Sequence, residues 1–264
     1  MYTFNYYKAT SAQSAASLIN GKPDAKFLAG GQSLIATMKL RLAEPSDLID
    51  LAGAAELKGI KVEGDKLVIG AMTTHADVAV DALVKSKFPA LAALAELIGD
   101  RQVRNRGTIG GSLANNDPAA DWPAAVLGAG ATIITNQRSI AADDFFKGMY
   151  ETELQEGELI AAVHFPIAKR AAYMKFKQPA SRFAIVGVFV SQGASGIRVA
   201  VTGASQSGVT RMKAIEDALA KSWSADAVKG VKIDAGNMNA DLHASAAYRA
   251  HLVSVMAARA VAAS

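Results

Sequence analysis

The stretch LAGGQSLIATMKLR, residues 28–41, places two adjacent glycines between an apolar run and a pattern typical of a helix. A second stretch, RNRGTIGGSLANNDPAADWPA (residues 104–124), repeats the glycine pair further along the chain. Glycine pairs let backbone N–H groups approach an oxyanion without interference from Cβ, and a following helix N-terminus adds partial positive charge. Two such loops suit a pyrophosphate better than a lone phosphate. Tight turns that bind nothing are an equally weighted alternative.

Composition narrows the class of protein. The 264 residues are 51% hydrophobic and 20% charged, which is ordinary for one or two globular domains. The net charge of +4 and the lack of long like-charge runs argue against a nucleic-acid-binding protein. No GxGxxG follows a strand, and neither GxxxxGK[ST] nor GxSxG occurs, so Rossmann, P-loop and hydrolase-elbow sites are unsupported.

The chain contains no cysteine. This excludes disulfides, thiolate-bound zinc and any iron–sulfur cluster held by this chain alone. The start MYTFNYYKAT lacks the order of a signal peptide, and the apolar stretch of residues 124–134 is shorter than the roughly 20 residues that span a bilayer. We expect a cytoplasmic protein with no transmembrane segment, associated with a membrane only through a complex.

Local patterns predict the first half of the chain. Thr10 and Gln13 have capping-box spacing and Gly21 closes the segment, so residues 11–20 are expected to form a helix. The pattern predicts short buried strands over 25–31 and 47–51, with a helix over 33–42 that Pro45 stops. Residues 57–73 are typical of a hairpin with its turn at Gly64 and Asp65.

The pattern from residue 74 onward predicts helices first and then a run of strands. Residues 74–100 are expected to form two helical stretches separated near Pro89, and residues 123–135 a small-residue helix that leads into a strand. A strand over 159–166 ends at Pro166, a plausible domain boundary. Strands then helices indicate an α+β domain beyond it. Strands are expected over 171–178, 183–192 and 196–205, and helices over 211–222 and 243–262.

Several polar residues have alternative interpretations. His75 and Asp77 could ligate a metal, but an N-capped turn with surface polar residues is favoured. Asp117 and Asp121 could be paired acids, although hydrogen bonding to a ligand hydroxyl or capping of the following helix is favoured.

Basic and aromatic residues leave similar choices. Three arginines lie close together in the sequence: Arg101, Arg104 and Arg106. They could bind phosphate or a partner, or they could form a solvated edge, and the sequence favours neither interpretation. Trp122 and Trp223 are expected to be packing residues.

Four stretches together resemble a known family. They are residues 27–51, residues 69–78 (IGAMTTHADV), residues 103–124 and residues 241–249 (DLHASAAYR). They are similar to the FAD-binding medium subunit of molybdenum hydroxylases, the group that includes carbon monoxide dehydrogenase and xanthine dehydrogenase. The likeness runs nearly end to end in matching order.

The resemblance implies an α+β fold. Residues 1–167 would form a FAD-binding domain of the vanillyl-alcohol-oxidase (PCMH) type, with subdomains of about 1–55 and 56–167. Residues 168–264 would form a C-terminal α+β domain with a small antiparallel sheet. The resemblance also implies a small partner with [2Fe–2S] clusters and a large partner with molybdopterin, in a dimer of heterotrimers. FAD would pass electrons from the clusters to an external acceptor. The lack of cysteine agrees with clusters held elsewhere.

The resemblance also assigns residues to the flavin. The first loop match is Ala29, Gly30, Gly31, Gln32 and Ser33; the second is Thr108, Ile109, Gly110, Gly111 and Ser112. Asp121 matches an acid at the ribityl or phosphate region, and Ile160 and Phe183 match positions near the isoalloxazine. Phe183 lacks the hydroxyl of the tyrosine common there. No histidine lies in either matched FAD loop, so FAD is expected to be non-covalent, with no catalytic or metal-binding residue in this chain.

Two other function classes remain open from the sequence. One is a stand-alone FAD-dependent oxidoreductase of the same fold, with its own substrate. The other is a flavin-free structural subunit. The sequence names neither the reducing substrate nor the acceptor, because the substrate chemistry would belong to the large partner.

Overall fold

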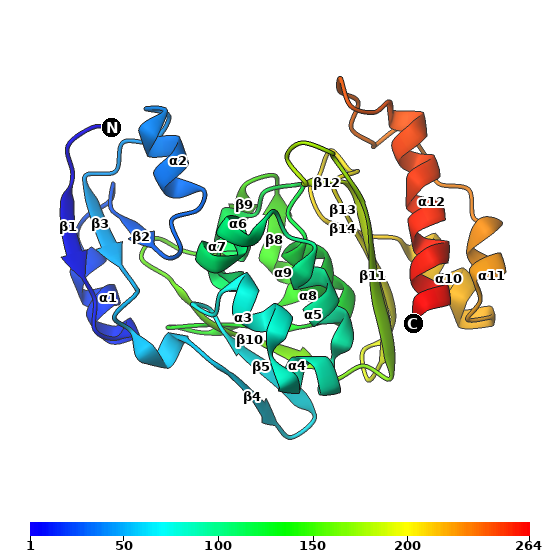
Figure 1. The fold of residues 1–264 in the computed structure, drawn as a ribbon, viewed down its shortest axis with the longest axis horizontal. Helices are drawn as coiled ribbons and strands as arrows, with labels where there is room; N and C mark the ends of the chain where they lie inside the picture. Colours follow the sequence, from blue (N-terminus) through cyan, green and yellow to red (C-terminus); the bar gives the residue numbers. More distant parts are fainter.

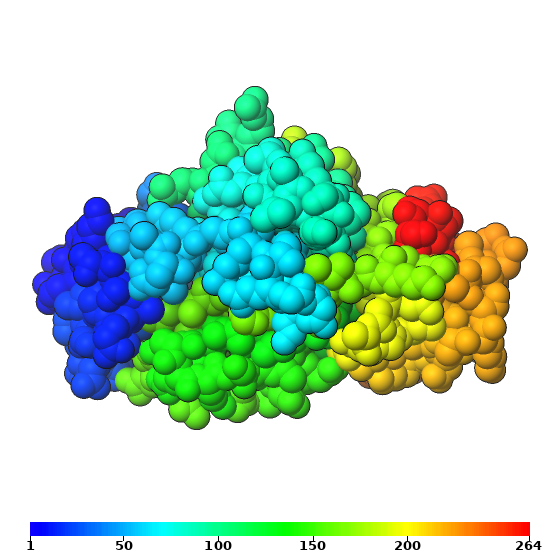
Figure 2. Space-filling view, turned by 90° about the horizontal axis from the view of Figure 1, so that it is seen from below, coloured from blue at the N-terminus to red at the C-terminus, as the bar shows by residue number.

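The computed structural model describes residues 1–264, which form three units in a row, each with its own hydrophobic core. Figure 2 shows the N-terminal unit at one end, the central unit in the middle and the C-terminal unit at the other end. Sheets of three, five and four strands belong to these units in chain order. The mixture of helices with parallel and antiparallel sheets is an α+β architecture, as predicted.

The N-terminal unit is a parallel sheet in the order β1-β3-β2. Its elements are β1 (Asn5–Lys8), α1 (Ala12–Ile19), β2 (Lys26–Leu28), α2 (Leu34–Lys39), β3 (Asp47–Asp50) and η1 (Ala55–Leu57). The two predicted strands and both helices are present. The first glycine pair lies between β2 and α2, at the strand–helix junction that the sequence predicted.

Two details of this unit differ from prediction. The capping box of α1 is formed by Ser11 and Ser14, not by Thr10 and Gln13, because the helix begins one residue later than the spacing suggested. Helix α2 ends at Lys39, well before Pro45. Its end is set by Arg41, whose φ of 59° cannot continue a right-handed helix.

The central unit is an antiparallel five-stranded sheet in the order β4-β5-β10-β6-β7. Its strands are β4 (Ile60–Glu63), β5 (Lys66–Gly70), β6 (Thr132–Thr135), β7 (Ser139–Ala141) and β10 (Ile160–Pro166), with a separate pair, β8 (Phe146–Gly148) and β9 (Glu151–Thr152). The hairpin β4–β5 and its turn are confirmed, since Glu63 pairs with Lys66. The strand predicted over 159–166 is also confirmed as β10.

Helices cover this central sheet. They are α3 (His75–Val80), α4 (Ala82–Lys87), α5 (Pro89–Glu96), α6 (Arg101–Arg106), α7 (Ile109–Asn115), α8 (Trp122–Ala129) and α9 (Ala142–Phe145). Residues 74–100 therefore hold three helices rather than two, because Asp81 ends α3 and also caps α4. Helix α8 leads into β6 as predicted.

The second glycine pair does not follow a strand. It lies in the first turn of α7, directly after α6, with Thr108 as the N-cap. The two glycine pairs therefore lie in different structural contexts, the first after a strand and the second after a helix. The apolar and polar residues around 98–108 follow no clear period, so the sequence pattern there does not distinguish a strand from a short helix.

The C-terminal unit is an antiparallel sheet in the order β11-β12-β13-β14. Its elements are β11 (Arg170–Lys177), β12 (Ala184–Gly193), β13 (Gly196–Thr202), β14 (Thr210–Arg211), α10 (Lys213–Lys221), α11 (Ala225–Lys229) and α12 (Ala246–Ala263). The three predicted strands and two predicted helices are confirmed; β14 and α11 were not expected.

Strand β12 explains how this unit attaches to the rest. Eight of its ten residues are buried in succession, which is typical of a strand covered on both faces. Helix α12 packs on one face and α8 on the other (Figure 1). At the second contact, a Cβ on Gly128 would come within 2.8 Å of Phe189, so a glycine is required there. None of the helices is both long and apolar enough to cross a membrane.

Candidate functional site

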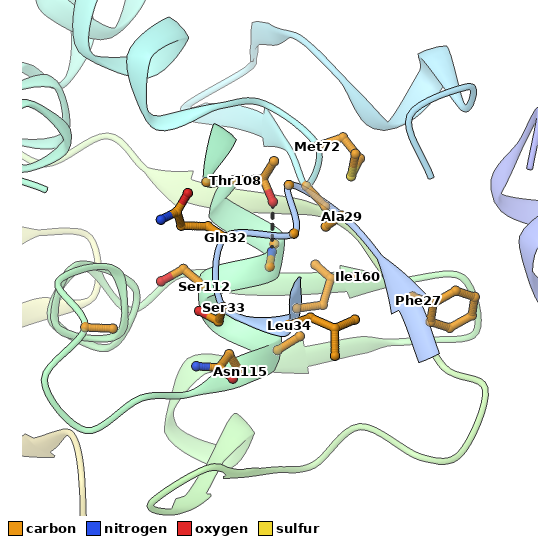
Figure 3. A pocket seen from close by; sticks show the side chains of 18 of the residues that line it. Phe27, Ala29, Gln32, Ser33, Leu34, Met72, Thr108, Ser112, Asn115 and Ile160 are labelled. Carbon is orange, nitrogen blue, oxygen red and sulfur yellow. Dashed lines mark hydrogen bonds between the residues drawn. The ribbon is translucent and has the colours of Figure 1, made fainter. Parts of the chain in front are cut away.

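A cavity of about 350 Å³ lies where the two glycine loops meet. We call residues 29–33 the first glycine loop and residues 108–112 the second. A Cβ on Gly111 would lie 3.4 Å from Cβ of Ala29, and one on Gly30 would collide with the backbone carbonyl of Arg106. The two loops therefore lie side by side, and Gly30 allows the first loop to approach the backbone directly before the second. Figure 3 shows their side chains converging on the cavity.

The first glycine loop presents unpaired backbone donors to this cavity. The N–H groups of residues 30–34 make no hydrogen bond within the chain, and all five residues line the cavity. Gly31 has a φ of 72°, a conformation that favours glycine. Gln32 and Ser33 are exposed and the other three residues are half-buried, so these five successive donors are accessible to a ligand. A run of free N–H groups at a turn suits an anion that accepts from several of them at once.

The second glycine loop differs, because its backbone donors are occupied. The N–H of Ile109 donates to Thr73, that of Gly110 to Ala71 and that of Gly111 to the Thr108 hydroxyl. A Cβ on Gly110 would lie 2.5 Å from Cβ of Ala71, so this glycine allows α7 to pack against the end of β5. The loop contributes side chains instead.

Polar side chains with no partner in the chain border the same cavity. Figure 3 shows them on the two loops and on α7: Gln32, Ser33, Ser112 and Asn115. Apolar side chains complete the wall, among them Phe27, Met72, Ile98, Leu154, Ile160 and Phe183. Such a cavity fits a ligand with an anionic part and a flat apolar part.

Residues 2–168 match the family model described as "FAD binding domain in molybdopterin dehydrogenase". The carbon monoxide dehydrogenase medium chain of Hydrogenophaga pseudoflava is 38% identical, with 86% of this chain and 83% of that one covered. The chain belongs to the FAD-binding medium subunits of molybdenum hydroxylases. It is therefore a flavoprotein subunit of an oxidoreductase, as the sequence resemblance implied.

Two further relatives cover the chain almost end to end. The glyceraldehyde dehydrogenase medium chain of Sulfolobus acidocaldarius is 34% identical over 97% of this chain and 96% of its own length. A chain of the reconstituted CO dehydrogenase from Oligotropha carboxidovorans superimposes with a TM-score of 0.92 at 32% identity, covering 99% of this chain and 97% of that one. The medium subunit fold thus extends through the C-terminal unit.

The structure brings nearly all of the predicted site residues of this medium subunit together. Twelve of them line the cavity: Ala29, Gly30, Gly31, Gln32, Ser33, Thr108, Gly110, Gly111, Ser112, Asp121, Ile160 and Phe183. Ile109 is the exception. Its side chain is fully buried in the central core and its N–H is already paired, so it offers a ligand neither group.

Asp121 has partners that local sequence could not reveal. One carboxylate oxygen accepts from the Tyr173 hydroxyl at 2.5 Å and the other from Nζ of Lys175 at 2.9 Å. Burial raises the pKa of the Asp121 carboxyl, and the Lys175 ammonium and the Tyr173 hydroxyl oppose that shift. Because both partners lie on β11, Asp121 ties the start of α8 to the C-terminal sheet.

Asp117 is separate from Asp121. Its carboxylate accepts from the backbone N–H of Ala119 and from the Tyr150 hydroxyl at 3.2 Å. The two carboxylates therefore do not form a hydrogen-bonded pair, and Asp117 stabilises the turn that precedes α8. Asp121 makes no side-chain cap to α8.

The sequence did not predict a half-buried ion pair at the wall of the cavity. Glu158 lines the cavity, and both of its carboxylate oxygens accept from Arg138, at 3.0 Å each. The Thr135 hydroxyl and the N–H of Gln155 complete its hydrogen bonds. The pair holds the segment that carries Leu154 and Ile160 against the cavity. Arg138 is 20 residues away in sequence, so spacing gave no signal.

The remaining candidates are structural. His75 is buried against Trp122 instead of lying on the surface, although Thr74 does cap α3. Nowhere do three His, Cys, Asp or Glu side chains gather into a metal-binding group. Trp122 is fully buried and Trp223 packs against the C-terminal core, which confirms both as packing residues.

The arginine cluster does not reach the cavity. Arg104 donates to the backbone carbonyls of Ile98 and Gly99, where it caps the preceding turn. Arg101 and Arg106 are exposed and form no ion pair with an acid of this chain. The solvated-edge interpretation fits this geometry better.

Proposed function

We propose that this medium subunit accepts electrons from [2Fe–2S] clusters of a small partner subunit and passes them to an external acceptor. A large partner subunit with molybdopterin would oxidise the substrate. The observation that carries the proposal is the run of five unpaired N–H groups in the first glycine loop, beside an apolar wall of the same cavity. FAD supplies the two-electron and one-electron chemistry that links such partners.

The chemistry of the cavity residues suits the parts of FAD. The N–H groups of residues 30–34 would hold the pyrophosphate, with hydroxyl support from Ser33 and Ser112. The apolar side chains of Ile98, Ile160 and Phe183 would contact the isoalloxazine ring. Asp121 has lone pairs left after its bonds to Tyr173 and Lys175, and one would accept from a ribityl hydroxyl. No side chain is required to bond the flavin covalently.

The division into domains is part of this proposal. We place the FAD-binding domain at 1–167, with subdomains of about 1–55 and 56–167, and the C-terminal domain at 168–264. The three sheets support these boundaries, and the strand β10 ends at Pro166. The hydrophobic clusters extend across them, since the central cluster includes Tyr173 and Phe189 of the C-terminal unit. FAD would thus lie between the two subdomains, with Phe183 reaching it from the C-terminal domain.

Binding of FAD and of FMN by the purified chain tests the pyrophosphate assignment. FAD should bind at least about 100-fold more tightly than FMN, because several charge-assisted hydrogen bonds of roughly 1.5–3 kcal/mol each are at stake. Fluorescence quenching titrations of the flavin-free chain would measure both dissociation constants. Equal affinities would contradict the assignment.

Isolation from the native host tests the electron path. We expect a dimer of heterotrimers in which added substrate bleaches the flavin only when both partners are present. A lone chain that oxidises a substrate by itself would instead favour a stand-alone FAD-dependent oxidoreductase. A colourless complex would favour a structural subunit. The cytoplasmic location stays a prediction that cell fractionation can test.

A further inference from the structure

His75 lies at the first position of α3 and reaches the wall of the cavity. Its ring is 5% exposed, and its Nδ1 is 3.0 Å from Nε1 of the buried Trp122. The backbone N–H of His75 donates to the carbonyl of Gly107, directly before the second glycine loop. The ring is therefore held from two sides.

The contact with Trp122 fixes where His75 carries its proton. An indole Nε1 is a donor only, so Nδ1 of His75 must be the acceptor in this hydrogen bond. A neutral imidazole that accepts at Nδ1 bears its hydrogen at Nε2. Burial, with the nearby Arg104 charge, lowers the pKa of His75 to about 4, so the ring is neutral near pH 7. His75 thus offers an Nε2–H donor.

This donor has no partner in the chain. Nε2 of His75 makes no hydrogen bond. It is also not among the fully enclosed side-chain atoms that lack a partner, which are Thr210 Oγ1 and Arg249 Nε. Nε2 is therefore not enclosed, and His75 lines the cavity.

Gly107 keeps the imidazole in this place. It has an ordinary φ of −61°, so its backbone does not demand a glycine. A Cβ there would instead lie 2.6 Å from Nε2 and 2.8 Å from Cδ2 of His75. The absence of a side chain at residue 107 is what leaves room for the ring at the cavity wall.

We propose that His75 is a cofactor-binding residue whose Nε2–H donates a hydrogen bond to an oxygen of FAD, with Trp122 and Gly107 as its positioning residues. The proposal rests on the proposed function, because it requires FAD in this cavity. Either a phosphate oxygen or a ring carbonyl oxygen has the acceptor chemistry required. A metal ion is not a suitable ligand, because no acid or second histidine joins His75.

Nitrogen-15 NMR of the histidine-labelled chain tests the donor directly, since only four histidines are present. The flavin-free protein should show His75 as the Nε2–H tautomer near pH 7. Saturating FAD should move the Nε2–H proton downfield while the tautomer is kept. A proton resonance that FAD leaves unchanged would overturn the proposal, and this readout needs no substitution.

Two variants measure the contribution of the hydrogen bond. His75→Phe keeps a ring of similar shape but loses the donor, and Gly107→Ala displaces the ring without changing it. Each should weaken FAD binding about tenfold, the size of one ordinary hydrogen bond. The exposed His243→Gln and the uncrowded Gly230→Ala are matched controls that should bind FAD like the unmodified chain.

The outcomes separate this proposal from the proposed function. An unmodified chain that binds no FAD defeats both. Normal FAD binding that neither His75→Phe nor Gly107→Ala weakens defeats the His75 proposal alone. A weakened affinity with a shifted flavin absorption band supports a ring carbonyl as the acceptor. A weakened affinity for FAD but not for riboflavin supports a phosphate oxygen.

Discussion

The two glycine loops have nearly the same composition and different physical roles. In the first loop, glycine gives the chain a left-handed turn at Gly31 and leaves five successive N–H groups unpaired at the cavity. In the second loop, the N–H groups are paired within the chain and Gly110 makes room for Ala71. One glycine pair therefore serves ligand binding and the other serves packing of the wall that faces the ligand.

Gly31→Val tests the binding side of this difference and should have the largest effect. Valine at a φ of 72° is strained, and its Cβ would lie 2.9 Å from Cγ1 of Ile35, so the loop must move. Loss of two hydrogen bonds to a charged phosphate would weaken FAD binding at least about 100-fold. Flavin absorbance per folded molecule, measured beside circular dichroism, gives the result.

The control for this variant is Gly21→Val. Gly21 has a nearly identical φ of 73° but no atom near its missing Cβ, and it lies outside the cavity. It should lose stability from backbone strain and keep its flavin. If both variants lost flavin equally, strain alone would account for the effect of Gly31→Val.

Asp121→Ala tests the region that follows the second loop. It leaves the Lys175 ammonium buried without its partner, which should lower the free energy of unfolding by about 3–5 kcal/mol. Asp117→Ala removes weaker hydrogen bonds and should cost about 1 kcal/mol. Urea unfolding of the flavin-free chains gives both values. The dissociation constant of FAD should also rise more in Asp121→Ala, and equal constants would contradict a ribityl contact.

Acid titration tests the packing of His75 behind the second loop. Because its native pKa is about 4 and its unfolded pKa is about 6.5, the unfolded chain takes up the proton first as the pH falls. Stability is therefore lost between pH 6.5 and pH 4, by about 3 kcal/mol relative to His75→Gln. Unfolding curves of both flavin-free chains across this range give the difference. Parallel pH profiles would mean that His75 titrates normally.

Gly110→Ala tests the packing side of the comparison and should have the smallest effect. The added methyl group would crowd Cβ and the backbone of Ala71, which should lower the free energy of unfolding by about 1–3 kcal/mol. Flavin content per folded molecule should be unchanged, in contrast to Gly31→Val. A folded but colourless Gly110→Ala would show that the second loop also binds FAD through its backbone.

Local sequence predicted those features of the fold that depend on neighbouring residues. The hairpin β4–β5, the buried strand β12 and the first strand–helix junction all follow from short-range patterns. Of the thirteen site residues that the family resemblance predicted, twelve line one cavity in the structure. Ile109 was included because it lies inside a matched motif, although its side chain faces the core.

The features that were missed depend on distant partners. Trp122 is 47 residues from His75, and Tyr173 and Lys175 are more than 50 residues from Asp121. The burial of His75 and the ion pair of Asp121 exist only after these segments meet. No local periodicity carries that information, because the same residues would be exposed in an isolated helix or turn.

The cavity wall takes residues from all three units, since Phe27, Ile160 and Phe183 belong to different units. A bound ligand raises the free energy of local opening of each unit, because opening any one of them releases the ligand. Without the ligand, the small N-terminal unit, which contributes only eight buried residues to its hydrophobic cluster, should open independently and exchange its amide hydrogens first. FAD binding thus couples the opening of the N-terminal unit to that of the other two units, which already share a hydrophobic cluster, so the order of assembly favours flavin before partner subunits.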